Sequence, residues 1–261
     1  MAAHPLRRAT DDRPDGPDFP ASTLVVLMRH RGATLSWLAR DTPDCIDEVI
    51  VVGGPLDVRV RTELLRRRPG LRLLEAAGGD DGAGRPLQGI GSAAGRRIVL
   101  MDAHGSMSPR EIPRYLHYLD SGFDFVKGSR FIAGGDCSGY PVLRRLGHRA
   151  LLAVAFLLYG QRLTDLWYGF CAFRREFLDL LAERLTDIEL VGAETVVHAL
   201  HFGLRVAEVP STERSRTARR TGRHTVRDGR RLLCLLWRER PRNILLRRLA
   251  RLLARRRAQA S

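Results

Sequence analysis

The chain has 261 residues, of which 44% are hydrophobic, so it is long enough for one globular domain with a sizeable core. Its 44 basic and 29 acidic side chains give a formal net charge of +15 at pH 7, and Lys127 is the single lysine among the arginines. This charge favours anionic partners, namely nucleic acid, acidic lipid headgroups or phosphorylated substrates, without choosing among them.

The composition also argues against several classes of protein. The four cysteines are far apart and form no Cys-x-x-Cys pair, which argues against a zinc site and a disulfide framework and suits a reducing cytosol. The N-terminus has no apolar signal core. The most apolar run, residues 150–159, has about half of the ~20 residues needed to span a bilayer. We therefore expect a protein that is soluble or peripheral to a membrane.

The two ends of the chain differ from its middle. Residues 1–22 combine several prolines with mixed charge, which predicts a disordered leader. In residues 241–261 the leucines share one helical face and the arginines lie mostly elsewhere, which predicts a basic amphipathic helix suited to an anionic headgroup layer. A terminal helix packed on the domain, with its arginines in water, is the alternative. The predicted domain spans residues 23–240.

The first half of that domain alternates apolar runs with amphipathic stretches. The predicted strands are residues 24–28, 48–52, 71–74, 97–101 and 123–126. The predicted helices are residues 34–40 and 58–67, and a third that begins at Pro109. Short Val/Ile/Leu runs separated by helices are typical of parallel strands covered on both faces. The predicted fold class is therefore α/β, with a doubly wound, mostly parallel sheet whose ligands bind outside the carboxyl ends of the strands.

The second half is less regular. Its pattern predicts helices over residues 142–159 and 194–202 and strands over residues 171–174 and 205–209. Residues 211–227 are basic and polar, which predicts a loop, and two helical segments separated by Pro241 follow it. The chain shows no internal repeat.

The segment VLMDAHG, residues 99–105, sets Asp102 at the tip of a buried strand in a glycine-containing turn. A carboxylate there can hold a divalent cation against a diphosphate. Capping of the next helix is the structural alternative, although Ser106 or Ser108 suits that role better. His104 stands two residues on, where a second acid would complete a cation clamp.

Three further segments carry candidate ligand-binding side chains. DFVKGSRF, residues 124–131, ends a strand in a Gly-Ser-Arg turn, and the planar guanidinium of Arg130 suits phosphate; a surface arginine is the structural alternative. TDLWYGFCAFRR, residues 164–175, sets Asp165 among aromatic side chains, and buried acids are rare without a partner. EVPSTERSRTARRTGRH, residues 208–224, is a basic loop that either binds phosphate or is a solvated charge run.

In this order, the segments resemble the family 2 glycosyltransferases of the polyprenyl-phosphate branch, which includes dolichyl-phosphate mannosyltransferases. The resemblance runs from about Leu24 to Arg240 and is strongest over MDAHGSMSPREIPRYLHYLDSGFDFVKGSRF. It continues through RRLGHRALLAVAFLLYG, TDLWYGFCAFRR, GAETVVHALHFGLRVAEVPS and VRDGRRLL. The resemblance implies a GT-A fold, a nucleotide-sugar donor and a divalent cation, Mn²⁺ or Mg²⁺, at an Asp-x-Asp motif. It also implies an acceptor that is often a membrane-anchored polyprenyl phosphate.

On the donor side, the resemblance makes Asp102 and His104 the metal ligands and donor contacts, because they match the two acids of the Asp-x-Asp motif. Asp57 and Arg85 are further implied donor contacts. Asp57 is the acid nearest to Val-Gly-Gly, which stands where the family has Val-Asp-Gly, and Arg85 lies where the family has Gly-Lys-Gly. The family's opening Pro-x-x-Asn-Glu-Glu is replaced by residues 28–32, which contain no acid.

On the acceptor side, the family pattern is kept. Arg130 matches the Gly-Ser-Arg associated with the acceptor phosphate, and Asp165 matches the acid before the Gly-Phe turn. Together with Asp102, these two are the implied catalytic residues. Glu194 matches an acid that opens a late helix. Arg214 or Arg216 matches the basic loop near the acceptor.

Two accounts of the altered donor side remain open. In the first, the enzyme is active, and His104 is a nitrogen ligand or a direct diphosphate contact. An Asp/His pair would then favour Mn²⁺ over Mg²⁺, and Arg29, Arg31 and Arg85 would hold part of the phosphate charge. In the second, the donor site is lost and the domain only binds lipid phosphate or a partner.

The resulting functional prediction is an inverting glycosyltransferase of a bacterial cell envelope, cytoplasmic and peripheral to the inner face of the membrane. An acceptor phosphate is largely dianionic at neutral pH and needs positioning more than a general base. Arg130 and residues 214–220 would hold that phosphate, Asp102 with a cation would stabilise the departing diphosphate, and Asp165 would orient a sugar hydroxyl or an arginine. A nucleic-acid binder is the rival from another class. We expect no nucleic-acid partner, because the chain has no recognisable helix-turn-helix, zinc finger or aromatic RNA platform.

Overall fold

The structure is a computed structural model of the chain. It describes residues 20–28, 35–53, 56–67, 70–75, 90–137, 141–181, 184–185, 190–214 and 222–241. Most of the predicted leader, and the predicted C-terminal helix from residue 242 onward, lie outside the described residues and stay predictions.

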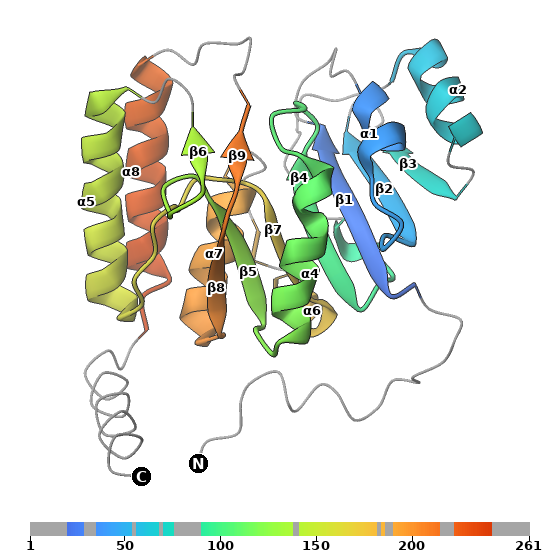
Figure 1. The fold of residues 1–261 in the computed structure, drawn as a ribbon. Helices are drawn as coiled ribbons and strands as arrows, with labels where there is room; N and C mark the ends of the chain where they lie inside the picture. Colours follow the sequence, from blue (N-terminus) through green and yellow to red (C-terminus); the bar gives the residue numbers. More distant parts are fainter. Residues whose placement is uncertain are drawn as a thin grey trace.

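A seven-stranded sheet in the order β3-β2-β1-β4-β7-β5-β8 forms the centre of the molecule (Figure 1). Its strands are β1 (Ser22–Met28), β2 (Glu48–Gly53), β3 (Leu71–Glu75), β4 (Arg97–Asp102), β5 (Phe125–Ser129), β7 (Cys171–Arg174) and β8 (Val206–Pro210). Every neighbouring pair is parallel except those of β7, which runs antiparallel to both β4 and β5. The predicted α/β class with a mostly parallel sheet is thus confirmed. β7 is the exception because the chain approaches it along the carboxyl edge of the sheet and enters the sheet from that side.

The helices lie close to the predicted ranges. They are α1 (Ser36–Asp41), α2 (Val58–Arg67), the 3₁₀ turn η2 (Pro109–Glu111), α4 (Ile112–Asp120), α5 (Val142–Tyr159), α6 (Arg175–Leu181), α7 (Val191–Phe202) and α8 (Gly222–Arg238). The prediction that residues 211–227 form one loop is wrong at both ends. A short strand, β9 (Thr212–Glu213), opens the segment, and α8 already begins at Gly222. The first turns of α8 have few apolar residues to signal a helix, while its later residues Leu232 and Leu236 are buried and anchor it.

The helices cover both faces of the sheet. One core joins sheet residues to α1, α2 and α4, and the other joins the opposite face to α6, α7 and the buried sides of α5 and α8. α5 and α8 lie side by side beyond the β8 end of the sheet (Figure 1), where the Tyr159 hydroxyl donates to the Leu236 carbonyl at 3.1 Å. In the described part of the chain, helices cover both faces of the sheet, so a ligand would reach it at the ends of the strands. We call the ends at which the parallel strands start and finish the amino and carboxyl edges of the sheet.

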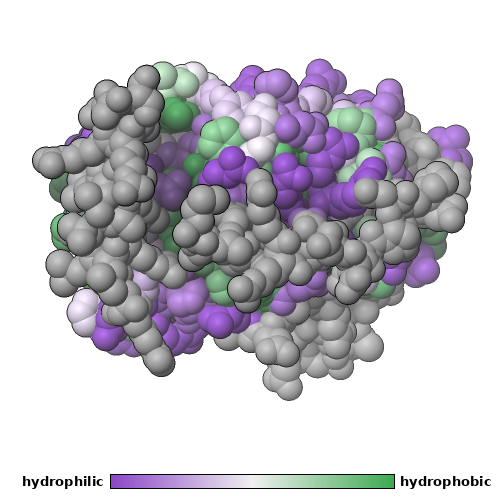
Figure 2. Space-filling view, turned by 90° about the horizontal axis from the view of Figure 1, so that it is seen from below, coloured by the Kyte–Doolittle hydropathy of each residue, from purple (hydrophilic) through white to green (hydrophobic). Residues whose placement is uncertain are grey.

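The two edges differ in what they carry. The face at the amino ends of the strands, seen from below in Figure 2, is mostly hydrophilic where its residues are described. At the opposite edge, β6 (Asp136–Cys137) pairs in parallel with β9 above the ends of β5 and β8 (Figure 1). β4 and β5 end at the same carboxyl edge, with Asp102 and Ser129. The predicted site residues are therefore sought there.

Two further predictions can be compared with the described residues. No helix among them is long and apolar enough to cross a bilayer. All four cysteines are free thiols, as their spacing predicts.

Candidate active site

The turn after β4 holds Asp102 and His104 at the carboxyl edge. Asp102 is buried, and the N–H of the next residue donates to the Leu27 carbonyl of β1 at 2.9 Å. Gly105 has φ of +69°, where glycine is favoured, and a side chain there would meet the indole nitrogen of Trp37 at 3.2 Å. The turn is thus held between β1 and α1, and it presents one carboxylate and one half-buried imidazole.

This donor set suits a divalent cation only in part. An oxygen and an imidazole nitrogen are acceptable ligands for Mn²⁺, and less so for Mg²⁺. Among the described residues, no group of three or more His, Cys, Asp or Glu side chains is arranged to hold a metal. Asp102 and His104 would therefore supply a minority of the ligands, and diphosphate oxygens and water would supply the rest.

The second strand explains one departure from the family pattern. Gly53, at the end of β2, has φ of +152°, and a Cβ there would lie 2.3 Å from the Met28 carbonyl oxygen of β1. A side chain cannot be accommodated at this position without moving β1, so an aspartate cannot simply be restored there. Asp57, the nearest acid, caps α2 instead, with Oδ1 accepting from the Arg59 N–H at 2.9 Å.

The predicted donor residues come from separate parts of the chain. β1 lies between β2 and β4, so Asp57 and Asp102 follow strands that are not neighbours. Arg29, Arg31 and Arg85 lie outside the described residues. Their donor contacts stay predictions.

Arg130 and Asp165, which are far apart in the sequence, form a buried ion pair. The Arg130 Nε and Nη2 donate to the two Asp165 oxygens at 2.7 and 3.0 Å. The side chains are 5% and 0% exposed. Asp165 Oδ1 also accepts from the N–H groups of Trp167 and Tyr168, at 3.0 and 3.2 Å. Of the two partners considered for Asp165, a sugar hydroxyl or an arginine, the structure provides the arginine.

Electrostatics keep this pair ionised. Burial opposes the charge on Asp165, but the Arg130 charge outweighs burial and lowers the pKa of Asp165 below its usual value. Burial likewise opposes the charge on Arg130, and the nearby carboxylates of Asp165 and Glu213 hold its pKa above its usual value. The guanidinium is further enclosed by the rings of Tyr168 and Phe131, whose centroids lie 5.1 and 5.3 Å from Cζ. Arg130 is thus rigidly oriented.

A second carboxylate, not expected from the sequence, contacts the same guanidinium. Arg130 Nη1 donates to Glu213 Oε2 at 2.6 Å. Glu213 lies on β9, and the Cys137 thiol on the paired strand β6 is 3.5 Å from the same oxygen. Burial raises the pKa of Cys137 to about 11, so this thiol is a neutral donor.

Lys127 on β5 and Glu208 on β8 both bind the backbone of the segment that carries Asp165. Lys127 on β5 is completely buried and its ammonium donates to the Tyr168 carbonyl; burial lowers its pKa, and the Asp165 charge opposes that shift. Glu208 on β8 accepts from the N–H groups of Thr164 and Asp165 at 2.8 and 3.0 Å, and burial raises its pKa. These bonds hold the segment that carries Asp165 against β5 and the edge strand β8.

The segment after β8 joins the Arg130 cluster to the Asp102 turn. The Ser211 N–H donates to the Ser129 carbonyl at 3.0 Å, and the Arg214 N–H donates to the Ser106 carbonyl at 2.9 Å. Glu111 of η2 anchors the segment by accepting from the Thr212 N–H at 3.2 Å. Arg214 is therefore beside the Asp102 turn and exposed, and Arg216 lies outside the described residues.

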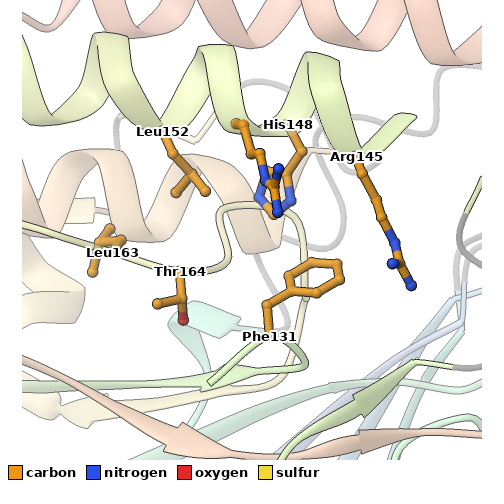
Figure 3. Close-up of a pocket in the computed structure, with 7 residues that line it drawn as sticks. Phe131, Arg145, His148, Leu152, Leu163 and Thr164 are labelled. Carbon is orange, nitrogen blue, oxygen red and sulfur yellow. The ribbon is translucent and has the colours of Figure 1, made fainter. Parts of the chain in front are cut away.

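A cavity of about 390 Å³ opens next to the Arg130–Asp165 pair, between α5 and the loops of residues 131 and 163–164. Figure 3 shows Arg145, His148 and Leu152 projecting from α5 toward Phe131 and Thr164 on the facing loops. Its full lining is Phe131, Arg145, His148, Arg149, Leu152, Leu163 and Thr164. Two arginines beside leucine and phenylalanine make it suitable for an anion that carries an apolar group.

His148 lines this cavity and is uncharged. Its Nε2 lies 3.1 Å from the Leu166 N–H, which donates to it, and its ring centroid is 5.2 Å from that of Phe131. Burial lowers the pKa of His148 to about 4, so the ring is uncharged at pH 7. The positive charge on the α5 side of the cavity therefore comes from Arg145 and Arg149.

Glu194 lies in the first turns of α7 and is buried. That helix packs against the turn after Asp165 through two glycines, since a Cβ at Gly192 would lie 2.4 Å from the Gly169 Cα. The structure thus brings the start of α7 to the turn after Asp165.

Sequence reasoning missed Lys127, Glu208, Glu213 and His148. A weak signal exists for two of them, because Lys127 and Glu208 interrupt apolar runs that are otherwise typical of buried strands. No local pattern marks Glu213 or His148, since their partners lie far away along the chain.

Comparison with known proteins places this chain in a family. The model for glycosyl transferase family 2 matches residues 36–181, more than half of the chain. A dolichyl-phosphate hexose transferase from Haloferax volcanii is 30% identical over 186 residues, which cover 71% of this chain and 77% of that protein. A polyprenol monophosphomannose synthase from Mycolicibacterium smegmatis is 32% identical over 117 residues, 44% of each chain.

Comparison with solved structures supports the GT-A fold. The glucosyl-3-phosphoglycerate synthase of Mycobacterium tuberculosis, determined with Mn²⁺ and uridine diphosphate, has a TM-score of 0.61 at 17% identity. The match covers 84% of this chain and 80% of that one, and another structure of that synthase holds Mg²⁺. The chain therefore has the GT-A fold and belongs to glycosyltransferase family 2, as its motifs predict.

Proposed function

We propose that this protein transfers a sugar, with inversion, from a nucleotide-sugar donor to the phosphate of a polyprenyl phosphate at the cytoplasmic surface of a membrane. The observation that carries the proposal is the cavity beside Arg130 and Asp165, which combines two arginines with apolar side chains. The names of the two similar transferases, which refer to dolichyl phosphate and polyprenol, support the same class of acceptor.

The acceptor side needs orientation more than it needs a base. A phosphate monoester is largely dianionic at neutral pH, so its oxygen is already nucleophilic. Arg145 and Arg149 would bind the phosphate, and the rigid Arg130–Asp165 pair would orient it toward the sugar. A phosphate oxygen then forms a bond to the anomeric carbon on the face opposite the leaving group, and the bond from that carbon to the donor diphosphate breaks.

The donor would bind at the turn after β4. Asp102 and His104 would hold the diphosphate end of the donor, with Arg214 beside the same turn. A divalent cation held there would supply positive charge to stabilise the departing diphosphate. The Asp102 carboxylate is fixed at the end of β4, so this charged group would already be in place before the reaction begins.

A membrane location is supported by the outer surface of α5 and α8. Both helices begin at the carboxyl edge of the sheet (Figure 1). They expose the apolar side chains Val142, Leu143, Leu146, Phe156, Leu157, Val226, Leu233 and Trp237. The arginines of the cavity lie on the same first turns of α5, so an apolar surface adjoins a site for phosphate.

The test is transfer by the purified full chain from labelled uridine- and guanosine-diphosphate sugars to a short polyprenyl phosphate, with Mn²⁺ or Mg²⁺. We expect label in the lipid product with the phosphate and none with the free polyprenol. Asp102→Asn should lower kcat/KM roughly 100-fold, the scale of losing one charge-stabilising group. Asp44→Asn, at an exposed carboxylate, is the matched control and should transfer like the parent.

A second candidate function is supported by the altered donor side, because the described residues hold no group of three or more His, Cys, Asp or Glu side chains arranged for a metal. In that case the chain binds polyprenyl phosphate without transferring a sugar. Binding of the lipid phosphate without binding of any of the nucleotide sugars would establish this candidate and refute the transferase.

A further inference from the structure

The two carboxylates on Arg130 are not equivalent. Asp165 is completely buried and also accepts from the Trp167 and Tyr168 N–H groups, so it is part of the turn itself. Glu213 contacts the remaining side of the guanidinium, Nη1, and its side chain is 13% exposed. Asp165 is thus the permanent partner of Arg130, and Glu213 is the partner on the outer side.

The supports of Glu213 are also weaker. It lies on the two-residue strand β9, whose register partner is Cys137 on the equally short β6, outside the main sheet. Glu111 accepts from the Ser211 hydroxyl and the Thr212 N–H, and the Arg214 N–H donates to the Ser106 carbonyl, so the backbone is held on either side of Glu213 while its side chain stays at the outer surface of the pair. Arg130, by contrast, is held by Asp165 and lies between two aromatic rings. If this contact opens, Glu213 moves and Arg130 stays.

The charges make Glu213 a competitor for an anion. The two carboxylates outnumber the one guanidinium that they bind, so Glu213 competes with an incoming phosphate for Arg130. Once Glu213 leaves, the Arg130–Asp165 pair is neutral and the outer guanidinium nitrogen can donate to a phosphate oxygen. A carboxylate and a phosphate cannot both occupy that nitrogen in the same geometry.

We propose that Glu213 is a carboxylate placeholder for the acceptor phosphate on Arg130, and that its displacement sets the affinity for the acceptor. This inference rests on the proposed function, because it takes the anion that reaches Arg130 to be the acceptor phosphate.

The test compares the affinities of the parent and Glu213→Gln for geranyl phosphate and for inorganic phosphate, measured by calorimetry on the full chain. Glutamine keeps the shape and can still accept from Arg130, but it removes the competing charge. We expect Glu213→Gln to bind geranyl phosphate about tenfold more tightly and to lower the acceptor KM about tenfold, with the donor KM unchanged. Asp136→Asn is the matched control, because it removes an exposed charge from the paired strand β6, and it should stay within about twofold of the parent.

Equal or weaker binding by Glu213→Gln than by Asp136→Asn overturns the inference, as does a lack of phosphate binding by all three proteins. Glu213→Ser is the second variant if Glu213→Gln unfolds, and it should also bind more tightly. The proposed function fails separately. If Glu213→Gln gains affinity for both ligands but the parent transfers no sugar to polyprenyl phosphate, the placeholder stands and the transferase does not.

Discussion

At the scale of single residues, the candidate active site is organised by Asp165 rather than by the residues that would meet a substrate. Its carboxylate binds two nitrogens of Arg130 and two backbone N–H groups of its own turn. A buried charge of this kind stabilises the fold only while its partners stay in place. Asp165 therefore acts as a positioning residue for Arg130 and for the loop that walls the cavity.

Asp165→Asn should lower the free energy of unfolding by about 3 kcal/mol at pH 7, because it leaves a buried guanidinium without its main partner. Urea denaturation measures this. Asp120→Asn, which breaks an ion pair of Arg97 with a largely exposed carboxylate, is the control and should cost less than about 1 kcal/mol.

The stability lost in Asp165→Asn should depend on pH. The folded-state pKa of Asp165 is lowered from its usual 3.8, so the charged carboxylate stabilises the fold fully above that value. This stabilisation is lost as the pH falls through the lower folded-state pKa. The stability difference between the parent and Asp165→Asn should therefore be constant above about pH 5 and shrink below pH 4. A difference that persists undiminished in acid would contradict the ionised pair.

At the scale of elements, close backbone contacts hold the helices against the site. α7 approaches the turn after Asp165 at Gly192 and Gly169, where no Cβ fits. Glu194 lies two residues further along α7 and is buried. The close approach at Gly192 therefore fixes the position of the helix start that carries it.

Gly192→Ala should destabilise the protein by about 2 kcal/mol, because the added Cβ would lie 2.4 Å from the Gly169 Cα and α7 would have to shift. Thermal and urea unfolding measure this loss. Gly229→Ala in α8 is the matched control, since a Cβ there meets nothing within 4 Å and alanine favours the helix. It should leave stability unchanged or raise it by up to about 1 kcal/mol. Equal effects of the two substitutions would show that α7 is not tightly packed at this turn.

At the scale of the whole molecule, the exposed apolar side chains of α5 and α8 adjoin the arginine-lined cavity. Under the proposed function this side would meet the membrane, and the net charge of +15 would favour an anionic lipid surface. The described residues on the face at the amino ends of the strands are mainly hydrophilic (Figure 2).

The double variant Leu143→Glu and Leu146→Glu should lower binding to phosphatidylglycerol vesicles more than about tenfold, since each leucine loses a contribution of about 1.5 kcal/mol or more from burial in lipid. Vesicle co-sedimentation measures this, and the Trp237 fluorescence should shift to shorter wavelength on binding of the parent. Val58→Glu, at an exposed valine of α2, is the matched control and should bind like the parent. Deletion of residues 243–261 tests the predicted C-terminal helix separately, and unchanged binding by the double variant would refute docking through α5.

Much of the fold could be predicted because its signals are local. Residues 58–67, 142–159 and 171–174 have the predicted boundaries, since apolar periodicity reports directly which side chains face a core. The antiparallel direction of β7 and the early start of α8 could not be predicted in this way. Both depend on how distant segments pack, and the residues themselves carry no sign of it.

The sequence by itself determined the α/β class, the position of Asp102 at a strand end and the family, because strand pattern, motif order and spacing are properties of the chain alone. Only the tertiary structure decided that Arg130 pairs with Asp165 and with Glu213, 35 and 83 residues away. It also decided that Lys127 and Glu208 bind the backbone of the segment around Asp165, and that a side chain at Gly53 would collide with β1. The physical reason is that a buried charge takes whichever partner packing brings within hydrogen-bond distance, and no local pattern encodes that choice.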